Sequence, residues 1–184
     1  MDDFENGFWV FGYGSLLWNP EFDFIDHAPA TLSGYARSFC MWSIHHRGSV
    51  EAPGLVLALD AQNGAICRGV AFQVGADTAV QCLADLRERE LVSSAYVEHH
   101  VSLRLDDGRT ITALAYVIDP DHTQYTGALS LDQQADIIAS ATGGRGPNSA
   151  YLFNTAAHLT ELGMECGELT RLAAKVRNRL EAKS

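Results

Sequence analysis

The sequence predicts an α+β fold in a single domain of residues 1–184, and three observations support this class. Short apolar runs and two-residue alternations typical of strands lie mainly in the first two thirds. The last third instead repeats its apolar residues every three to four positions, as helices do. Strands thus come first and helices mostly afterwards, without the regular alternation of a parallel α/β sheet. No repeat or Pro/Ser-rich linker divides the chain, whose length suits one domain.

The expected strands begin with the apolar run Phe-Trp-Val-Phe at residues 8–11, which stops at Gly12. A short run of aromatic and β-branched residues that ends in a glycine is typical of a buried strand followed by a turn. Further strands are expected at residues 55–59 and 69–74. The Asn63-Gly64 pair between them predicts a turn that separates the two strands.

A β-hairpin is the clearest prediction in the chain. Residues 96–105 and 110–118 both have strand-like sequence, and Asp106-Asp107-Gly108 lies between them. An Asp-Gly pair between two such arms favours a tight turn. A helix is expected before the hairpin, at about residues 77–91.

The last third of the chain predicts helices. Ser130 followed by Gln133 fits a capping box, which begins a helix through Ile138. The glycine-rich segment 143–147 interrupts this region. Apolar residues then recur at helical spacing in two groups, namely Leu152, Phe153, Leu159 and Leu162, followed by Leu169, Leu172, Val176 and Leu180.

The charge balance excludes several functional classes. Thirteen Lys and Arg residues against 23 Asp and Glu residues give a formal net charge of −10. Because an acidic surface repels phosphate backbones and anionic lipid, we expect no nucleic-acid partner and no membrane partner. The chain has no run of about 18 apolar residues that could span a membrane. The N-terminus lacks the basic and apolar parts of a secretory signal, which predicts a cytoplasmic protein.

The sequence predicts no metal site. Its four cysteines form no Cys-x-x-Cys pair, and no His-Glu-x-x-His motif occurs. The adjacent pairs His45-His46 and His99-His100 cannot present both rings on one face of a strand. We therefore expect the cysteines to be small buried hydrophobic residues.

The first candidate site is the loop Gly12-Tyr13-Gly14-Ser15-Leu16, directly after the expected first strand. Two glycines separated by one residue allow backbone N–H groups to converge on a carboxylate or phosphate without a cationic side chain. A dinucleotide-binding fingerprint would need a third glycine where Leu17 stands, and no Gly-Lys-Ser/Thr follows. An ordinary strand-ending turn would explain the two glycines equally well.

The second candidate is Glu90, at the end of the helix expected at residues 77–91. At about 100° per residue from Ala79, Glu90 falls near 20°, between the directions of Leu83 and Leu86. A carboxyl group within an apolar stripe has a raised pKa, because burial disfavours its charged form. Such a shift moves the group toward the range useful to a general acid or base.

Glu88 falls about 180° from the start of the same stripe and is expected to face water. Two alternatives to a catalytic Glu90 stay open at this point. The helix could fray before residue 90, or Glu90 could pair with an arginine such as Arg87 or Arg68.

An ordered set of motifs extends over nearly the whole chain. It comprises Val10-Phe11-Gly12-Tyr13-Gly14-Ser15-Leu16-Leu17-Trp18, Arg37-Ser38-Phe39, His46-Arg47-Gly48, Pro53-Gly54-Leu55-Val56, Arg89-Glu90-Leu91, Asp107-Gly108-Arg109 and Asn148-Ser149-Ala150-Tyr151-Leu152. In this order the motifs resemble the ChaC family of γ-glutamylcyclotransferases. The resemblance is to its bacterial branch, in which the catalytic glutamate lies six residues before a tyrosine, here Tyr96.

The resemblance implies an enzyme that cleaves glutathione into 5-oxoproline and cysteinylglycine, built on a closed mixed β-sheet (a barrel) flanked by helices. It implies no cofactor, because the α-amine of the substrate attacks its own γ-carbonyl. Glu90 is then the expected general acid and base. The expected substrate-binding residues are Gly12, Tyr13, Gly14, Ser15, Leu16, Leu17, Arg37 and Tyr151, with Arg47 as a second candidate cation. We expect a monomer or a weak homodimer.

Three other functions stay open at this point. One is a cyclotransferase that acts on another γ-glutamyl amine, because the sequence says little about the leaving group. Another is a non-enzymatic regulator of cation transport, since one fold can serve unrelated functions. The third is a domain that binds an anionic metabolite without turnover.

Overall fold

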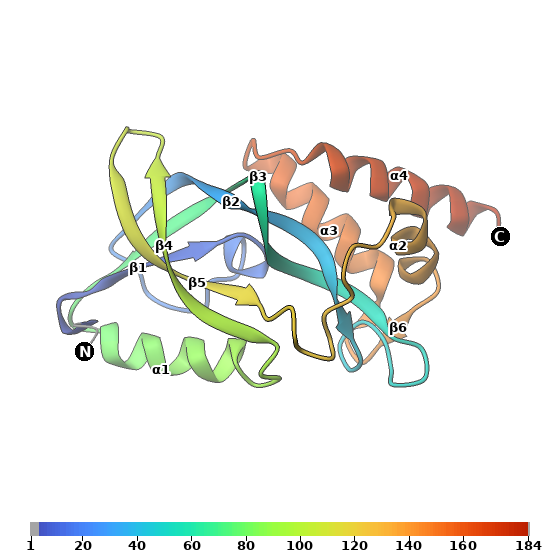
Figure 1. Ribbon diagram of the computed structural model, residues 1–184, viewed down its shortest axis with the longest axis horizontal. Helices are drawn as coiled ribbons and strands as arrows, with labels where there is room; N and C mark the ends of the chain where they lie inside the picture. The colour runs from blue at the N-terminus through green and yellow to red at the C-terminus, as the bar shows by residue number, and fades with distance from the viewer. Residues whose placement is uncertain (1–3, 184) are drawn as a thin grey trace. The chain divides into compact units, whose positions relative to one another are not determined.

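The computed structural model describes residues 4–183 and divides them into two compact units. Unit 1 contains the described residues up to Arg37 together with Leu59–His122. Unit 2 contains Ser38–Ala58 and the described residues from Thr123 onward. The elements labelled in Figure 1 are the strands β1 (Phe8–Gly12), β2 (Asp26–Ser43), β3 (Gly54–Val74), β4 (Tyr96–Leu105), β5 (Thr110–Ile118), β6 (Thr142–Gly143) and β7 (Gly146–Pro147), and the helices α1 (Ala79–Glu90), α2 (Leu131–Ile138), α3 (Asn148–Glu161) and α4 (Gly167–Glu181).

Five strands form a closed barrel in the order β1-β3-β2-β4-β5. β1 pairs antiparallel with β3 and parallel with β5, and β4 pairs antiparallel with both β2 and β5, so the sheet is mixed. Together with the helices, this confirms the α+β fold and the closed mixed barrel that were expected. None of the helices in residues 4–183 is long and apolar enough to cross a membrane.

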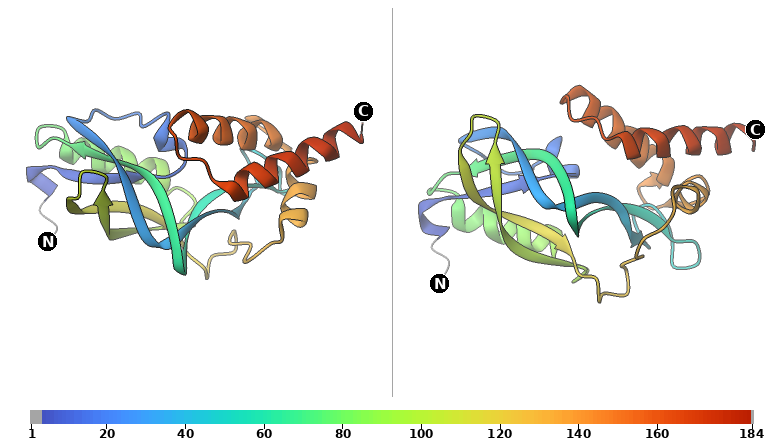
Figure 2. Two further views of the ribbon diagram at one scale, coloured as in Figure 1. Left: turned by 90° about the horizontal axis from the view of Figure 1, so that it is seen from above. Right: turned by 45° about the horizontal axis from the view of Figure 1, so that its top comes forward.

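Alternate residues of β1 and β5 face two different apolar clusters. Phe11 and Ala113 belong to a cluster with residues from all five barrel strands, whereas Val10 and Leu114 belong to a cluster with α1. Both faces of these strands are therefore buried, which explains why their sequences are nearly continuous apolar runs. Figures 1 and 2 show α1 lying along one side of the barrel strands.

The predicted hairpin is confirmed as β4 and β5. Its nine paired positions run from Tyr96 opposite Ile118 to Arg104 opposite Thr110. At the turn Gly108 has a φ angle of 92°. Only glycine adopts this left-handed backbone region without a steric cost, which is why the Asp-Gly pair identified the turn.

The prediction of two separate strands around Asn63-Gly64 is wrong. β3 runs without interruption for 21 residues, although Gly64 has a φ angle of 79°. Its neighbour in the barrel is β2, a strand of 18 residues that the sequence pattern did not predict. Pairing with a long partner carries β3 through a position where the local sequence favours a turn.

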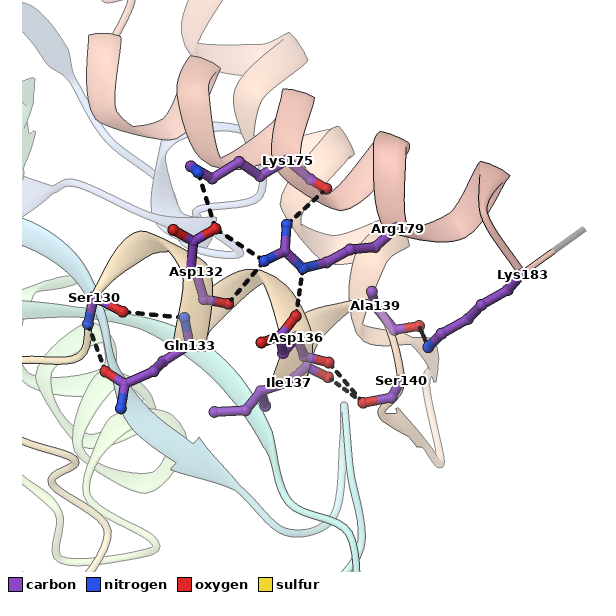
Figure 3. A network of polar contacts seen from close by, with 10 residues as sticks. All are labelled: Ser130, Asp132, Gln133, Asp136, Ile137, Ala139, Ser140, Lys175, Arg179 and Lys183. Carbon is purple, nitrogen blue, oxygen red and sulfur yellow. Dashed lines mark hydrogen bonds and ion pairs between the residues drawn. The ribbon is translucent and has the colours of Figure 1, made fainter.

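Three helices, α2, α3 and α4, belong to unit 2. α2 begins with the predicted capping box, in which Ser130 Oγ accepts from Gln133 N and Gln133 Oε1 accepts from Ser130 N. The glycine-rich segment forms the short β6–β7 pair ahead of α3. Figure 3 shows how α2 and α4 are joined by a network of polar contacts, formed by Asp132, Asp136, Lys175 and Arg179.

Candidate active site

The loop after β1 turns directly into a short 3₁₀ helix at Ser15–Leu17. Two N–H groups form hydrogen bonds within this segment: Leu17 N donates to Gly14 O and Asn19 N donates to Ser15 O, each at 2.9 Å. In the described part of the chain, the N–H groups of Gly14, Ser15 and Leu16 have no acceptor. A Cβ atom on Gly14 would meet nothing within 4 Å. The loop thus presents N–H donors beside open space, as an anion-binding loop must.

The side chains of the loop hold it against unit 1. The hydroxyl of Tyr13 donates to the carbonyl oxygen of Tyr116 on β5 at 2.9 Å. Leu16 belongs to the apolar cluster of α1, and Leu17 is also buried. These side chains fix the backbone of the loop, which carries the three N–H donors.

Arg37 on β2 holds the loop from a second direction. Its Nε donates to the carbonyl oxygen of Tyr13 at 2.5 Å, and its Nη2 donates to the carbonyl oxygen of Arg68. Arg37 is only 8 % exposed, and none of the described carboxylates pairs with it. The two carbonyls accept hydrogen bonds but do not neutralise the charge, and a buried charge without an opposite charge is unfavourable. Arg37 therefore brings an uncompensated positive charge next to the loop.

Glu90 is the last residue of α1 and lies on its buried face, as the periodicity predicts. The helix presents Cys82, Leu83 and Leu86 to the apolar cluster, and the Glu90 side chain is 18 % exposed. Burial raises the pKa of the Glu90 carboxyl above its ordinary value, and the neighbouring charge of Arg89 opposes this shift. The helix does not fray before residue 90, so that alternative is excluded.

Arg89 connects the Glu90 carboxylate to the loop. Its Nε lies 3.3 Å from Glu90 Oε1, and its Nη2 donates to Ser15 Oγ at 3.1 Å. Its Nη1 donates to three further oxygen atoms, namely Asn19 O at 3.0 Å, Pro20 O at 3.2 Å and Glu21 Oε2 at 3.0 Å. The presumed acid–base group and the presumed anion-binding loop are thus joined through one guanidinium group.

The alternative that Glu90 pairs with an arginine is therefore met, but by Arg89 and not by Arg87 or Arg68. Arg87 instead forms a two-bond ion pair with Glu98, and Arg68 pairs with Asp106. The sequence offered no signal for the contacts of Arg89, because helical periodicity gives the direction of a side chain but not its reach to a distant loop.

Tyr116 lies close enough to Glu90 for the two groups to affect one another. Its hydroxyl donates to Glu98 Oε2 at 3.3 Å. Burial raises the pKa of Tyr116, and the charges of Glu98 and Glu90 raise it further. The phenol is therefore neutral at physiological pH and is not a competing base.

Arg47 and Tyr151, which were also expected to bind the substrate, belong to unit 2. Tyr151 on α3 packs edge-on against Phe39, with ring centroids 5.9 Å apart. The Arg47 guanidinium lies 5.4 Å from the centre of the Tyr151 ring and donates to the carbonyl oxygen of Arg145 at 2.7 Å. The substrate-binding role of Tyr151 stays a prediction.

No group of three or more His, Cys, Asp or Glu side chains in residues 4–183 is arranged to hold a metal ion. Cys40, Cys67 and Cys82 are buried and Cys166 is half-buried. Burial raises the pKa of the Cys82 thiol to about 11, with further contributions from Asp85 and Asp23. The candidates for chemistry in unit 1 are therefore Glu90, the loop and the two arginines beside it.

Comparison with protein families gives a single match that spans both units. The sequence model of a family described as "ChaC-like protein" matches residues 8–179. This chain belongs to the ChaC-like family. The matched residues include the loop after β1, the whole of α1 and most of unit 2.

Individual members of this family are similar over most of their length. The glutathione-specific γ-glutamylcyclotransferase of Escherichia coli K12 is 38% identical over 176 residues, which are 96% of this chain and 75% of that protein. The protein of the same name from Schizosaccharomyces pombe is 34% identical, over 96% of each chain. A crystal structure of a yeast γ-glutamyl cyclotransferase specific to glutathione superposes with a TM-score of 0.83, covering 95% of this chain and 97% of that one. At 24% identity this structure supports the fold alone.

Proposed function

We propose that the chain is a glutathione-specific γ-glutamylcyclotransferase, which converts glutathione into 5-oxoproline and cysteinylglycine. The α-amino nitrogen of the γ-glutamyl residue attacks the γ-carbonyl carbon and closes a five-membered ring. The bond between that carbon and the cysteine nitrogen then breaks. Because nucleophile and electrophile belong to one molecule, the reaction needs no nucleophilic side chain and begins with a high effective molarity.

Glu90 carries the proposal, because the reaction requires one proton acceptor that later becomes a donor. Two protons pass from the α-ammonium group to the departing cysteine nitrogen, which leaves as an ammonium group, and Glu90 carries them one at a time. A buried carboxyl with a raised pKa suits both steps better than an exposed one. The exposed Glu88, two residues earlier on α1, lacks that environment.

The loop and Arg37 account for recognition of an anionic substrate by an acidic protein. The N–H groups of Gly14, Ser15 and Leu16 bind the α-carboxylate or the oxyanion that develops on the γ-carbonyl. The buried charge of Arg37 makes the potential at the loop locally positive. Such short-range interactions overcome a net charge of −10, whose field is screened by salt at longer range.

The proposal is tested by incubating the purified chain with glutathione and measuring 5-oxoproline. We expect turnover by the wild type, a loss of about 10³-fold or more in Glu90→Gln, and near wild-type turnover in the matched control Glu88→Gln. A panel of other γ-glutamyl amines determines whether cysteinylglycine is the preferred leaving group. Binding of glutathione without formation of 5-oxoproline would contradict the proposal and favour a binding domain or a regulator.

Three further predictions accompany this proposal. One family model spans both units, which supports a single catalytic domain of residues 1–184. A monomer or weak homodimer and a cytoplasmic location remain predictions from the sequence. Size-exclusion chromatography with light scattering measures the first of these two directly.

A further inference from the structure

Arg89 is placed unusually among the arginines of unit 1. Arg87 pairs with the carboxylate of Glu98, and Arg68 pairs with that of Asp106. Arg89 instead contacts five residues, four of which lie 68 to 74 positions earlier in the chain. All three guanidinium nitrogens are engaged, so the orientation of the planar group is fixed.

Apolar contacts with α1 also hold the two ends of the segment that Arg89 binds, because Leu16 belongs to the apolar cluster of α1 and Phe22 packs against it. A cavity of about 120 Å³ is lined by Pro20, Glu21 and Phe22 on one side and by Asp85, Leu86 and Arg89 on the other. A second cavity of about 440 Å³ lies between residues 21–23 and the first turns of α1. Between these apolar contacts, the hydrogen bonds of Arg89 attach the backbone of Asn19 and Pro20.

We infer that Arg89 is a positioning residue that fixes the loop at residues 15–21 and the Glu90 carboxylate in one arrangement. Its Nη2 and Nη1 restrain the loop through Ser15, Asn19 and Pro20. Its Nε lies 3.3 Å from Oε1 of Glu90, and this ion pair favours one orientation of the carboxylate. The kinetic part of this inference rests on the proposed function, whereas its structural part does not.

The charge of Arg89 also sets where Glu90 loses its proton. Burial raises the pKa of Glu90 and Arg89 opposes that shift. From the strands packed against α1, the other titratable groups are Tyr116 on β5 and Glu98 and Tyr96 on β4. Removing the charge of Arg89 leaves burial unopposed, so the pKa of Glu90 rises and the acidic limb of kcat/KM moves to higher pH.

Two substitutions separate the geometry of Arg89 from its charge. Arg89→Met removes both, whereas Arg89→Lys keeps the charge and loses the planar fork. We expect Arg89→Met to raise KM for glutathione on the order of tenfold, to lower kcat, and to move the acidic limb to higher pH. Arg89→Lys raises KM similarly but keeps the acidic limb near its wild-type position. Arg87→Met, the matched control on the same helix, should change neither KM nor the position of the acidic limb.

Hydrogen exchange tests the structural part without any substrate. The protected N–H groups of Leu17, Trp18 and Asn19 should exchange about tenfold faster in Arg89→Met, while the β4–β5 hairpin keeps its wild-type rates. Unchanged exchange in the loop overturns the anchoring role of Arg89. If Arg89→Met does not fold, Arg89→Lys and Ser15→Ala give the same comparison.

The two proposals fail in different ways. A wild type without 5-oxoproline formation refutes the proposed function, and loop exchange still decides whether Arg89 anchors the loop. An active wild type whose Arg89→Met variant keeps its KM, kcat and pH profile refutes the role of Arg89 and leaves the proposed function standing.

Discussion

Two ionic groups of unit 1, Arg37 and Glu90, differ in kind from those that join α2 and α4 in unit 2. In unit 2 the carboxylates of Asp132 and Asp136 meet Lys175 and Arg179 at the surface, and each charge lies beside an opposite one (Figure 3). In unit 1 Arg37 is buried without a carboxylate among the residues described.

The same contrast holds for the carboxylates and the direction of their pKa shifts. Hydrogen bonds from Lys175 and then from Arg179 lower the pKa of Asp132. Burial raises the pKa of Glu90 despite the adjacent Arg89. The first arrangement favours the charged form and stabilises the fold, whereas the second opposes it. Groups whose surroundings oppose their charge are typical of functional sites, which makes Arg37 and Glu90, unlike the helix network, candidates for such a role.

The largest effect that tests this contrast is expected at Arg37. Arg37→Met keeps much of the side-chain volume but removes the charge and both donors to the carbonyls of Tyr13 and Arg68. We expect turnover to fall on the order of 10²-fold. Stability should fall by about 1–3 kcal/mol, because two carbonyls lose their hydrogen-bond donors. Removal of the unfavourable buried charge offsets part of this loss.

Urea denaturation and 5-oxoproline formation measure these two effects. Arg68→Met is the matched control, because the Arg68 side chain is half exposed and pairs only at the surface with Asp106. Wild-type turnover in Arg37→Met would show that the buried charge has no part in catalysis.

A smaller effect is expected on the stability of Glu90→Gln. Because the folded-state pKa of Glu90 is raised, its ionisation opposes folding as pH rises above about 4.5. The variant should therefore have a higher Tm than the wild type at pH 7, and the difference should vanish below about pH 4.5. Thermal unfolding at several pH values measures this, and a lower Tm at pH 7 would contradict the assigned direction.

The smallest effect, of opposite sign, is expected for Asp132→Asn in unit 2. The pKa of Asp132 is lowered, so its stabilisation is present above about pH 3.8 and is lost as pH falls through the lowered value. We expect Tm at pH 7 to fall by roughly 2 °C at low salt and by less at high salt. Turnover should not change. A fall in turnover would show that the helix network contributes to catalysis and would contradict the contrast between the two units.

The features that the sequence predicted depend on local geometry. Glu90 was identified because the direction of a helical side chain follows from its position along the helix, and the Asp-Gly turn because Gly108 needs a positive φ angle. The capping box of α2 is local in the same sense, since Ser130 and Gln133 are three residues apart.

The features that the sequence did not predict depend on contacts between distant segments. β3 passes through Gly64 because a long neighbour pairs with it, and the local sequence contains no trace of that neighbour. Arg89 meets Ser15 across 74 positions of the chain. Arg37 was expected to bind substrate, but its bonds to two backbone carbonyls became visible only in the folded barrel.

The division of the chain into units has a consequence for synthesis on the ribosome. Each unit is made of two segments, and residues 38–58 of unit 2 lie between the two segments of unit 1. Every residue of unit 1 has been translated once His122 is added, whereas α4 of unit 2 ends 59 residues later, at Glu181. Unit 1 can therefore begin to fold on the nascent chain before the helices α2, α3 and α4, which share unit 2 with residues 38–58, have been synthesised.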